Sequence, residues 1–294
     1  RMFTQFFGNY LLNTGLVSPE HLSDALQQQK NTRLKLGVLA INAGLMTAEQ
    51  VDRVHAEQQR VDKRIGDIMV DMGYVTREQI EQLFKTQPSG HLLLGQALVD
   101  NGYMTNSQFE NALASYKAEN GISDADFYNS ADENVGKLVD HFYNIKKDSN
   151  TKYLTGYISL LLKNIIRFIG DDFTPLDADY IKNKICEGCT GQRISGGLSA
   201  ITVIEADEFT SVEFASRFAN EQLTVNDDYT QACLSEFLNL HNGLFAVNVS
   251  NEEGIELKLE PQEYYNSLDM SKLDNVYVVP ICFSFGTVKF IISM

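Results

Sequence analysis

Hydrophobic and polar positions repeat with a period of 29 residues in the first part of the chain. Each copy opens with a glycine that follows two mostly apolar residues: Phe6-Phe7-Gly8, Lys35-Leu36-Gly37, Arg64-Ile65-Gly66 and Leu93-Leu94-Gly95. Seven residues later comes a second glycine: Gly15, Gly44, Gly73 and Gly102. A hydroxyl residue follows each second glycine: Ser18, Thr47, Thr76 and Thr105. A fixed repeat of this length predicts one small structural unit per copy.

Each copy is predicted to form a short helix, a glycine turn and a longer helix. The threonines are followed three residues later by Gln50, Gln79 and Gln108, which is the pattern of a capping box at a helix start. The longer helices carry apolar stripes: Leu22, Ala25, Leu26; Val51, Val54; Ile80, Leu83, Phe84; Phe109, Ala112, Leu113. The second glycine is expected in the left-handed conformation. Because a single hairpin cannot bury its apolar side, we expect a compact array of four hairpins.

The recurring glycines, leucines and glutamines resemble the MshEN domain, the N-terminal module of type II secretion and pilus ATPases. Some members of that family bind cyclic di-GMP through tandem motifs that open with Arg-Leu-Gly and close on Gln. The opening arginine survives here only as Arg64, whereas the closing glutamine is kept in three copies and replaced by Tyr116 in the fourth. The resemblance therefore implies a nucleotide site between the second and third copies, made of Lys35, Leu36, Gly37, Gln58, Arg64, Ile65, Gly66 and Gln87. The alternative is that these residues serve packing and capping alone. His55 stands where the other copies have Leu26, Phe84 and Leu113, so we expect it to be an interior histidine.

The pattern changes in the second half of the chain. Residues Asp124 to Ser149 predict a linker, helical only in the apolar segment Val135 to Tyr143. Beyond it we expect helices at Tyr153–Ile169, Ser211–Gln222 and Asp227–Asn242, and strands at Arg193–Ile204 and Val276–Met294. The predicted class is α+β: an all-α array over residues 1–118, a linker over 119–150, and an α/β sandwich with an antiparallel sheet over 151–294.

Composition and charge narrow the function classes. The 294 residues carry a formal net charge of -15, and most of the acidic excess lies after residue 120. Since binding to a phosphate backbone needs clustered cations, nucleic acid is not expected as a partner. No run of about 18 apolar residues occurs, so we expect no membrane insertion and a cytoplasmic protein.

Four cysteines are present, and two of them have the Cys-x-x-Cys spacing of zinc and redox sites, Cys186 and Cys189. A closed zinc site needs four ligands, and Cys233 and Cys282 stand alone. We therefore interpret the segment as a turn joining a helix to a strand and expect no metal, with a metal or redox site as the alternative.

The helix expected over Asp227–Asn242 places two polar side chains together. At 100° per residue, a core stripe is predicted from Cys233, Phe237, Leu240 and Leu244. Glu236 and Asn239 then share another face with small neighbours, Ala232 and Gly243. A carboxylate and a carboxamide on a face of this kind leave room for another surface to approach. The alternative is that both side chains are simply solvated.

The sequence contains Glu236-x-x-Asn239, then 21 residues and Pro261, and before them the Gly-Gly segment Ile194–Leu198. This frame resembles the CheC/CheX/FliY phosphatases, and CheX most of all. In that family the glutamate forms a salt bridge to the active-site lysine of a phosphorylated receiver domain. The asparagine lies beside the acyl phosphate and orients a water for in-line attack. The resemblance implies these two catalytic roles for Glu236 and Asn239, Mg²⁺ supplied by the CheY-like receiver with no intrinsic cofactor, and a homodimer. The sequence departs from the family at Ala232, where aspartate or serine is usual.

The sequence thus favours a chemotaxis-type signal transduction protein that dephosphorylates a response regulator, with the repeats as a regulatory or docking module. Two alternatives remain. The first is an adaptor that binds a receiver without hydrolysis, and the second is a cyclic di-GMP effector whose CheX-like half serves dimerisation. Ala232 favours the adaptor and Arg64 favours the effector, so whether the chain is an enzyme stays open.

Overall fold

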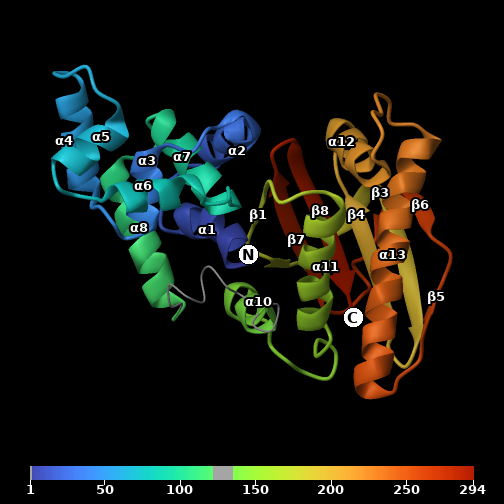
Figure 1. Cartoon of the computed structure of the whole chain (residues 1–294). Helices are drawn as coiled ribbons and strands as arrows, with labels where there is room; N and C mark the ends of the chain where they lie inside the picture. Colours follow the sequence, from blue (N-terminus) through green and yellow to red (C-terminus); the bar gives the residue numbers. More distant parts are fainter. Residues whose placement is uncertain (1, 122–134) are drawn as a thin grey trace. The chain divides into compact units, whose positions relative to one another are not determined.

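The structure is a computed structural model that describes residues 2–121 and 135–294. The chain divides into two compact units, Arg1–Ala131 and Asp132–Met294 (Figure 1). Each unit has its own secondary-structure class and its own core.

The first unit is helical. Its elements are α1 (Met2–Asn13), α2 (Pro19–Gln28), the 3₁₀ turn η1 (Gln29–Asn31), α3 (Leu36–Asn42), α4 (Ala48–Gln58), α5 (Ile65–Asp71), α6 (Arg77–Phe84), α7 (Gly90–Asp100) and α8 (Asn106–Glu119). The predicted order of a short helix and then a longer one is found in the last three copies. It is wrong in the first, where α1 has 12 residues and α2 has 10.

The turns of the first unit follow the local signals in the sequence. Thr47, Thr76 and Thr105 each form both bonds of a capping box with the glutamine three residues later. Ser18 accepts a hydrogen bond from the backbone of His21, with proline in the first helical position. The second glycine of each copy has a φ between 67° and 73°. These predicted caps and turns are confirmed.

Aromatic packing joins the first and last copies. The ring of Phe7 lies 6.2 Å from that of Phe109 and 5.5 Å from that of Tyr116. Gly95 allows this approach, because a Cβ there would lie 2.5 Å from the Phe109 ring. The first and last copies also bury Leu26 and Leu113, but the corresponding residues of the second and third copies are exposed: His55 is exposed, and Phe84 is 69% exposed. The prediction that His55 is interior is therefore wrong, because it occupies one of these outward positions.

The second unit combines helices with one antiparallel sheet. Its elements are α10 (Val135–Tyr143), α11 (Leu154–Phe168), β1 (Phe173–Pro175), β2 (Asp179–Tyr180), β3 (Ile185–Gly196), β4 (Ala200–Glu205), α12 (Glu208–Ala219), α13 (Asp228–Glu253), β5 (Leu257–Leu259), β6 (Glu263–Asp269), β7 (Val276–Phe283) and β8 (Gly286–Ser293). The strand order is β1-β7-β8-β4-β3-β5, with β2 on β7 and β6 on β3. The predicted α+β class with an antiparallel sheet is confirmed.

The core of the second unit lies between the sheet and α11, α12 and α13 (Figure 1). Phe214 of α12 and Phe237 of α13 pack edge to face, with ring centres 5.1 Å apart, and both contact the Phe290 ring of β8. Since aromatic side chains bury large apolar areas, this cluster fixes α12 and α13 against the sheet.

Several predicted boundaries are wrong in this unit. Residues 193–204 and 276–294 are not single strands but hairpins, since the chain reverses at 197–199 and at 284–285. Glycines with positive φ, Gly196 at 106° and Gly286 at 143°, adjoin these reversals. The third predicted helix extends beyond residue 242 to Glu253. Of the predicted linker, residues 124–134 lie outside the described residues and 135–143 form α10.

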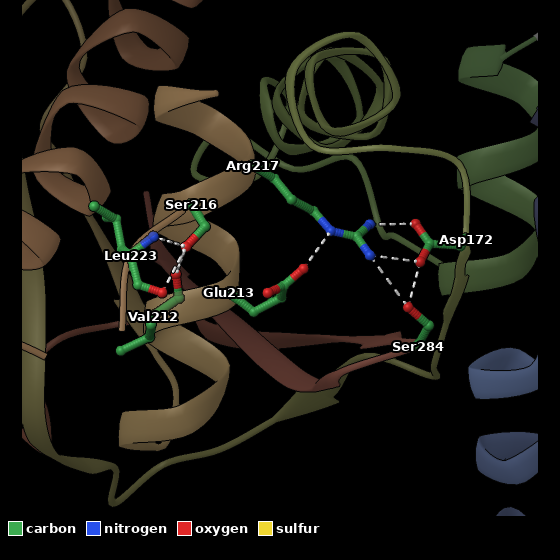
Figure 2. Close-up of polar contacts among 7 residues, drawn as sticks. All are labelled: Asp172, Val212, Glu213, Ser216, Arg217, Leu223 and Ser284. Carbon is green, nitrogen blue, oxygen red and sulfur yellow. Dashed lines mark hydrogen bonds and ion pairs between the residues drawn. The ribbon is translucent and has the colours of Figure 1, made fainter. Parts of the chain in front are cut away.

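A partly buried ion pair ties α12 to the loops at one end of the sheet (Figure 2). The Arg217 guanidinium contacts both carboxylate oxygens of Asp172, at 2.5 and 3.0 Å, and donates to Glu213 at 3.1 Å. Ser284, in the turn between β7 and β8, also hydrogen-bonds to Asp172. Because a two-pronged arginine–carboxylate pair fixes direction as well as distance, it orients α12 on the sheet.

Candidate functional site

The candidate site lies on α13, the longest helix of the second unit. Asp227 caps its first turn by accepting from the Thr230 backbone at 3.0 Å, and Gly254, with φ 67°, ends it. Its buried side consists of Thr230, Cys233, Leu234, Phe237, Leu238, His241, Asn242, Phe245 and Val249. The predicted core stripe is therefore partly wrong, since Leu240 is only half-buried and Leu244 is 37% exposed.

Glu236 and Asn239 lie beside this buried side, at the surface. Glu236 is exposed and Asn239 is half-buried, and the small neighbours Ala232 and Gly243 are accessible. A Cβ on Gly243 would meet only the Leu259 side chain, at 3.9 Å. Within residues 135–294, Glu236 takes part in no ion pair. The carboxylate is thus available to a cation on an approaching surface.

The Asn239 side chain is held in place by a hydrogen bond from the sheet. Its Oδ1 accepts a hydrogen bond of 2.9 Å from Nε2 of Gln192, which lies on β3 and is 2% exposed. Gln192 was not among the residues predicted from the sequence. It precedes the strand expected from Arg193, and its pairing with Thr202 and its orientation toward the helices follow only from the folded sheet.

Gln192 belongs to a buried polar network between α11, α13 and the sheet. Its Oε1 accepts from Nδ2 of Asn242 at 2.8 Å, and the same Nδ2 donates to Thr202 at 2.9 Å. Asn242 also accepts from the Tyr157 hydroxyl at 2.8 Å, and burial raises the pKa of Tyr157 well above its usual value. Since buried polar groups are costly when unpaired, a satisfied network of this kind fixes the side chains in it.

Next to this network lies a buried histidine. Nδ1 of His241 is 2.9 Å from the Asn164 amide, and its ring packs edge to face on Tyr157 with centres 4.5 Å apart. Burial lowers the pKa of His241 to about 3, so the imidazole is neutral at pH 7. It lies under the helix and does not face the surface of Glu236.

Apolar side chains flank Glu236 along the helix. Tyr229 is 48% exposed and Val247 is 56% exposed. With Ala232, Leu244 and Gly243 they form a mainly apolar exposed face in which Glu236 is the charged member. A surface with one charge in an apolar surround is suited to contact another protein.

The predicted nucleotide site is only partly assembled. A cavity of about 290 Å³ is lined by Leu36 of the second copy and by Arg64, Ile65 and Gly66 of the third, together with Arg77 and Phe84. Lys35, Gly37, Gln58 and Gln87 do not line it.

The residues outside the cavity have other surroundings. The Lys35 ammonium forms an ion pair of 2.7 Å with Asp100. Gly37 lies against α4, since a Cβ there would meet Val51 at 2.8 Å. Gln58 and Gln87 are exposed. The cavity therefore presents two guanidinium groups and an aromatic ring, but not the two glutamines.

The paired cysteines lie within β3, so their prediction as a turn between a helix and a strand is wrong. Gly188, with φ 59°, interrupts the regular alternation of the strand and lets Cys186 and Cys189 share one face of the sheet. Both are free and buried, and Cys186 contacts the Met270 sulfur at 3.6 Å. Among the residues that the structure describes, no cluster could hold a metal ion.

None of the helices in the described part of the chain combines the length and the apolar character needed to cross a membrane.

Comparison with known proteins gives structural neighbours alone. No protein-family model and no curated protein matches the chain. The neighbours are CheX-, CheC- and FliY-like chemotaxis proteins. A CheC-like superfamily protein from Shewanella sp. PV-4 is 14% identical with a TM-score of 0.43, over 49% of this chain and 97% of its own. The chemotaxis protein CheX from Vibrio vulnificus is 13% identical with a TM-score of 0.41, over 48% and 98%. A CheX–CheY–BeF₃–Mg²⁺ complex from Borrelia burgdorferi is 17% identical with a TM-score of 0.37, over 48% and 96%.

Proposed function

We propose that the second unit is a phosphatase that hydrolyses the aspartyl phosphate of a response-regulator receiver domain. The observation that carries the proposal is the anchoring of Asn239. Its amide is fixed at the protein surface by Gln192, one turn from the unpaired carboxylate of Glu236. The spacing of these two residues and of Pro261 is the frame that resembles the CheX phosphatases.

The chemistry asks little of the protein beyond position. In the reaction, a water oxygen forms a bond to phosphorus as the bond from phosphorus to the aspartate oxygen breaks. The aspartate leaves as a carboxylate, and both protons of the water leave with the phosphate as H₂PO₄⁻, which then equilibrates with solvent. The receiver supplies Mg²⁺, so the helper has to dock and to hold the water in line, and orientation of this kind accounts for large rate effects.

Asn239→Ala tests the positioning role. We expect the dephosphorylation rate to fall on the order of 10²-fold while complex formation is retained, because a positioning group acts mainly in the transition state. The measurement is the lifetime of phosphoaspartate on the organism's own receivers, with and without the protein. Asn248→Ala is the matched control, since Asn248 is an exposed asparagine of the same helix. Equal rates for both variants would assign the water to another residue.

Glu236→Lys tests the docking role. Because the proposed ion pair forms at a rim that solvent reaches, the variant should weaken association, and added salt should reproduce part of the loss in the wild type. Glu252→Lys is the control, because it makes the same charge change at an exposed position on α13. If Glu252→Lys weakens association as much as Glu236→Lys, net charge and not the site governs binding.

The adaptor is a second candidate function. It is favoured by Ala232, which is exposed beside Glu236 where the related phosphatases have aspartate or serine. An adaptor would bind a phosphorylated receiver without changing the phosphoaspartate lifetime. Wild-type protein that binds but does not shorten this lifetime would replace the phosphatase with the adaptor.

A cyclic di-GMP effector is the third candidate. It is favoured by the cavity of about 290 Å³ that contains Arg64, whose guanidinium suits guanine and phosphate recognition. Calorimetry of the intact protein with cyclic di-GMP tests it, with Arg64→Ala as the variant and Arg33→Ala as the control outside the cavity. The resemblance to CheX also implies a homodimer, which sedimentation of the same samples tests.

A further inference from the structure

We propose that Gln192 is a positioning residue that holds the Asn239 amide with its NH₂ group turned outward, so that the site offers its partner a hydrogen-bond donor. The catalytic role of this donor rests on the proposed phosphatase function. The orientation of the amide itself follows from the hydrogen bonds of the second unit.

The starting point is the backbone carbonyl of Glu260, which can only accept. It lies 2.9 Å from the Gln192 side chain, so the group of Gln192 that faces it must be the amide nitrogen. Two further hydrogen bonds fix Glu260 to β3: its backbone donates to the Arg193 carbonyl at 2.9 Å, and its carboxylate accepts from Ser195 at 2.9 Å. Pro261 follows directly, and a residue before proline is restricted to extended backbone. The proline of the sequence frame thus helps to aim the carbonyl that orients Gln192.

The other end of the Gln192 amide agrees with this orientation. Its oxygen accepts from Asn242, and the second proton of that Asn242 amide goes to Thr202. The Asn242 oxygen in turn accepts from Tyr157. Gln192, Thr202 and Asn242 are each at most 2% exposed. A flipped Gln192 amide would place its oxygen against the Glu260 carbonyl and its nitrogen against the Asn242 nitrogen. Because water cannot reach these buried groups to replace the lost bonds, the flip is strongly disfavoured.

The polarity of Asn239 follows. One proton of Gln192 Nε2 goes to the Glu260 carbonyl and the other to Asn239, so the Asn239 atom that faces Gln192 is its oxygen. The Asn239 nitrogen is left toward the surface, and in the described part of the chain it has no hydrogen-bond acceptor. An outward N–H can donate to one lone pair of a water oxygen while the second lone pair of that oxygen attacks phosphorus. It can also donate to a phosphoryl oxygen. It cannot accept a proton from the water.

The orientation is tested in the free protein by NMR. Both amide protons of Gln192 are bonded and buried, so they should exchange with solvent at least 10²-fold more slowly than those of Asn239. The resonances are assigned by their loss in Gln192→Met and Asn239→Asp. If Asn239 instead donated to Gln192, one of its two amide protons would be protected, so an Asn239 proton that exchanges as slowly as those of Gln192 would overturn the orientation. This result does not depend on any receiver.

The positioning role is tested by turnover of the full chain on a receiver that the wild type dephosphorylates. Gln192→Glu removes both donors, so the Asn239 amide should rotate to donate inward and present its oxygen. We expect kcat to fall at least 10-fold with KM unchanged. Gln231→Glu is the control, because it replaces the same side chain at a half-buried position on α13. The Gln231 side chain also contacts β3, where it accepts a hydrogen bond from Thr190.

Asn239→Asp keeps the proposal testable if the buried carboxylate of Gln192→Glu prevents folding. An ionised carboxylate cannot donate, whereas a protonated one can. The rate of Asn239→Asp should therefore fall about as far as that of Asn239→Ala at pH 8, and its ratio to the wild-type rate should rise as the pH falls. A wild-type-like rate at pH 8, or unchanged kcat in a folded Gln192→Glu, would refute the donor. Absence of wild-type turnover on every receiver would instead refute the proposed function, and the exchange rates would still decide the orientation.

Discussion

The two units differ in how far apart along the chain their decisive contacts lie. In the repeat unit, the turn at Thr76 is closed by two bonds to Gln79, at 2.8 and 3.2 Å, over three residues. In the second unit, Asn239 is held by a residue 47 positions away, and Gln192 is oriented by a carbonyl 68 positions away. Local contacts repeat visibly in a sequence, whereas long-range contacts depend on the completed fold.

Glycines make the same distinction. Gly73 of the repeat unit has φ 73°, and an added Cβ would meet nothing within 4 Å. Gly286 of the second unit has φ 143°, and a Cβ there would lie 2.1 Å from the Thr210 hydroxyl of α12. The first glycine serves its own turn, and the second permits a helix to approach a hairpin.

Gly286→Ala should therefore destabilise the protein strongly. It adds an unfavourable backbone conformation to a clash with a residue that is 1% exposed, and together these should cost about 3 kcal/mol or more of unfolding free energy. Urea unfolding of the full chain measures the loss.

Thr210→Ala separates the two causes. It removes the hydroxyl and methyl that the new Cβ would meet, so the double variant should be more stable than the sum of the two single changes predicts. Additive effects would leave backbone strain as the whole cause.

Acid should destabilise both units, because each contains one fully buried histidine. Burial lowers the pKa of His91 to about 3 and that of His241 to about 3. The unfolded chain therefore binds protons that the folded chain excludes, and the stabilisation present above pH 6.5 is lost as the pH falls toward 3. By pH 5 the loss should reach roughly 2 kcal/mol for each histidine. Unfolding free energies at pH 7 and pH 5 measure it before most carboxylates titrate.

The two histidines differ in their hydrogen bonds. Both ring nitrogens of His91 lie near polar atoms, Ser89 at 3.0 Å and Asn42 at 3.1 Å. Nε2 of His241 has no hydrogen-bond partner in the described part of the chain. His91→Gln and His241→Gln should each flatten the acid dependence by about half. A variant that keeps the full wild-type slope would remove its histidine from the explanation.

Local contacts could be predicted from the sequence, and long-range contacts could not. The capping boxes and the left-handed glycines depend on residues a few positions apart, and they were predicted. Glu236 and Asn239 were placed on one face because a helix turns by 100° per residue whatever it packs on. Leu244 was wrongly placed in the core, because the wheel used hydrophobicity alone and the buried side of α13 includes the polar Asn242 and His241.

The support beneath the site could not be predicted in this way. Gln192 is an ordinary strand residue until the hairpin of β3 and β4 turns it toward α13. The carbonyl that orients it belongs to a residue after β5, which pairs with β3 only in the folded sheet. Nothing in the local pattern around residue 192 indicates either contact.

Substitution of Gly73 should change the unfolding free energy least, because only its own backbone conformation is affected. Because Gly73→Ala meets no neighbouring atom, it should cost about 1 kcal/mol, the energy of placing a side chain in the left-handed conformation. Gly73→Asn should cost less, since asparagine tolerates this conformation. Gly156→Ala is the matched control: its Cβ also meets nothing within 4 Å, but Gly156 lies inside α11, where alanine is favoured over glycine by roughly 0.5–1 kcal/mol. The two alanine variants should thus shift the unfolding free energy in opposite directions. A shift of the same sign in both would mean that φ does not determine the cost at Gly73, and the repeat turns would then depend on contacts beyond their own residues.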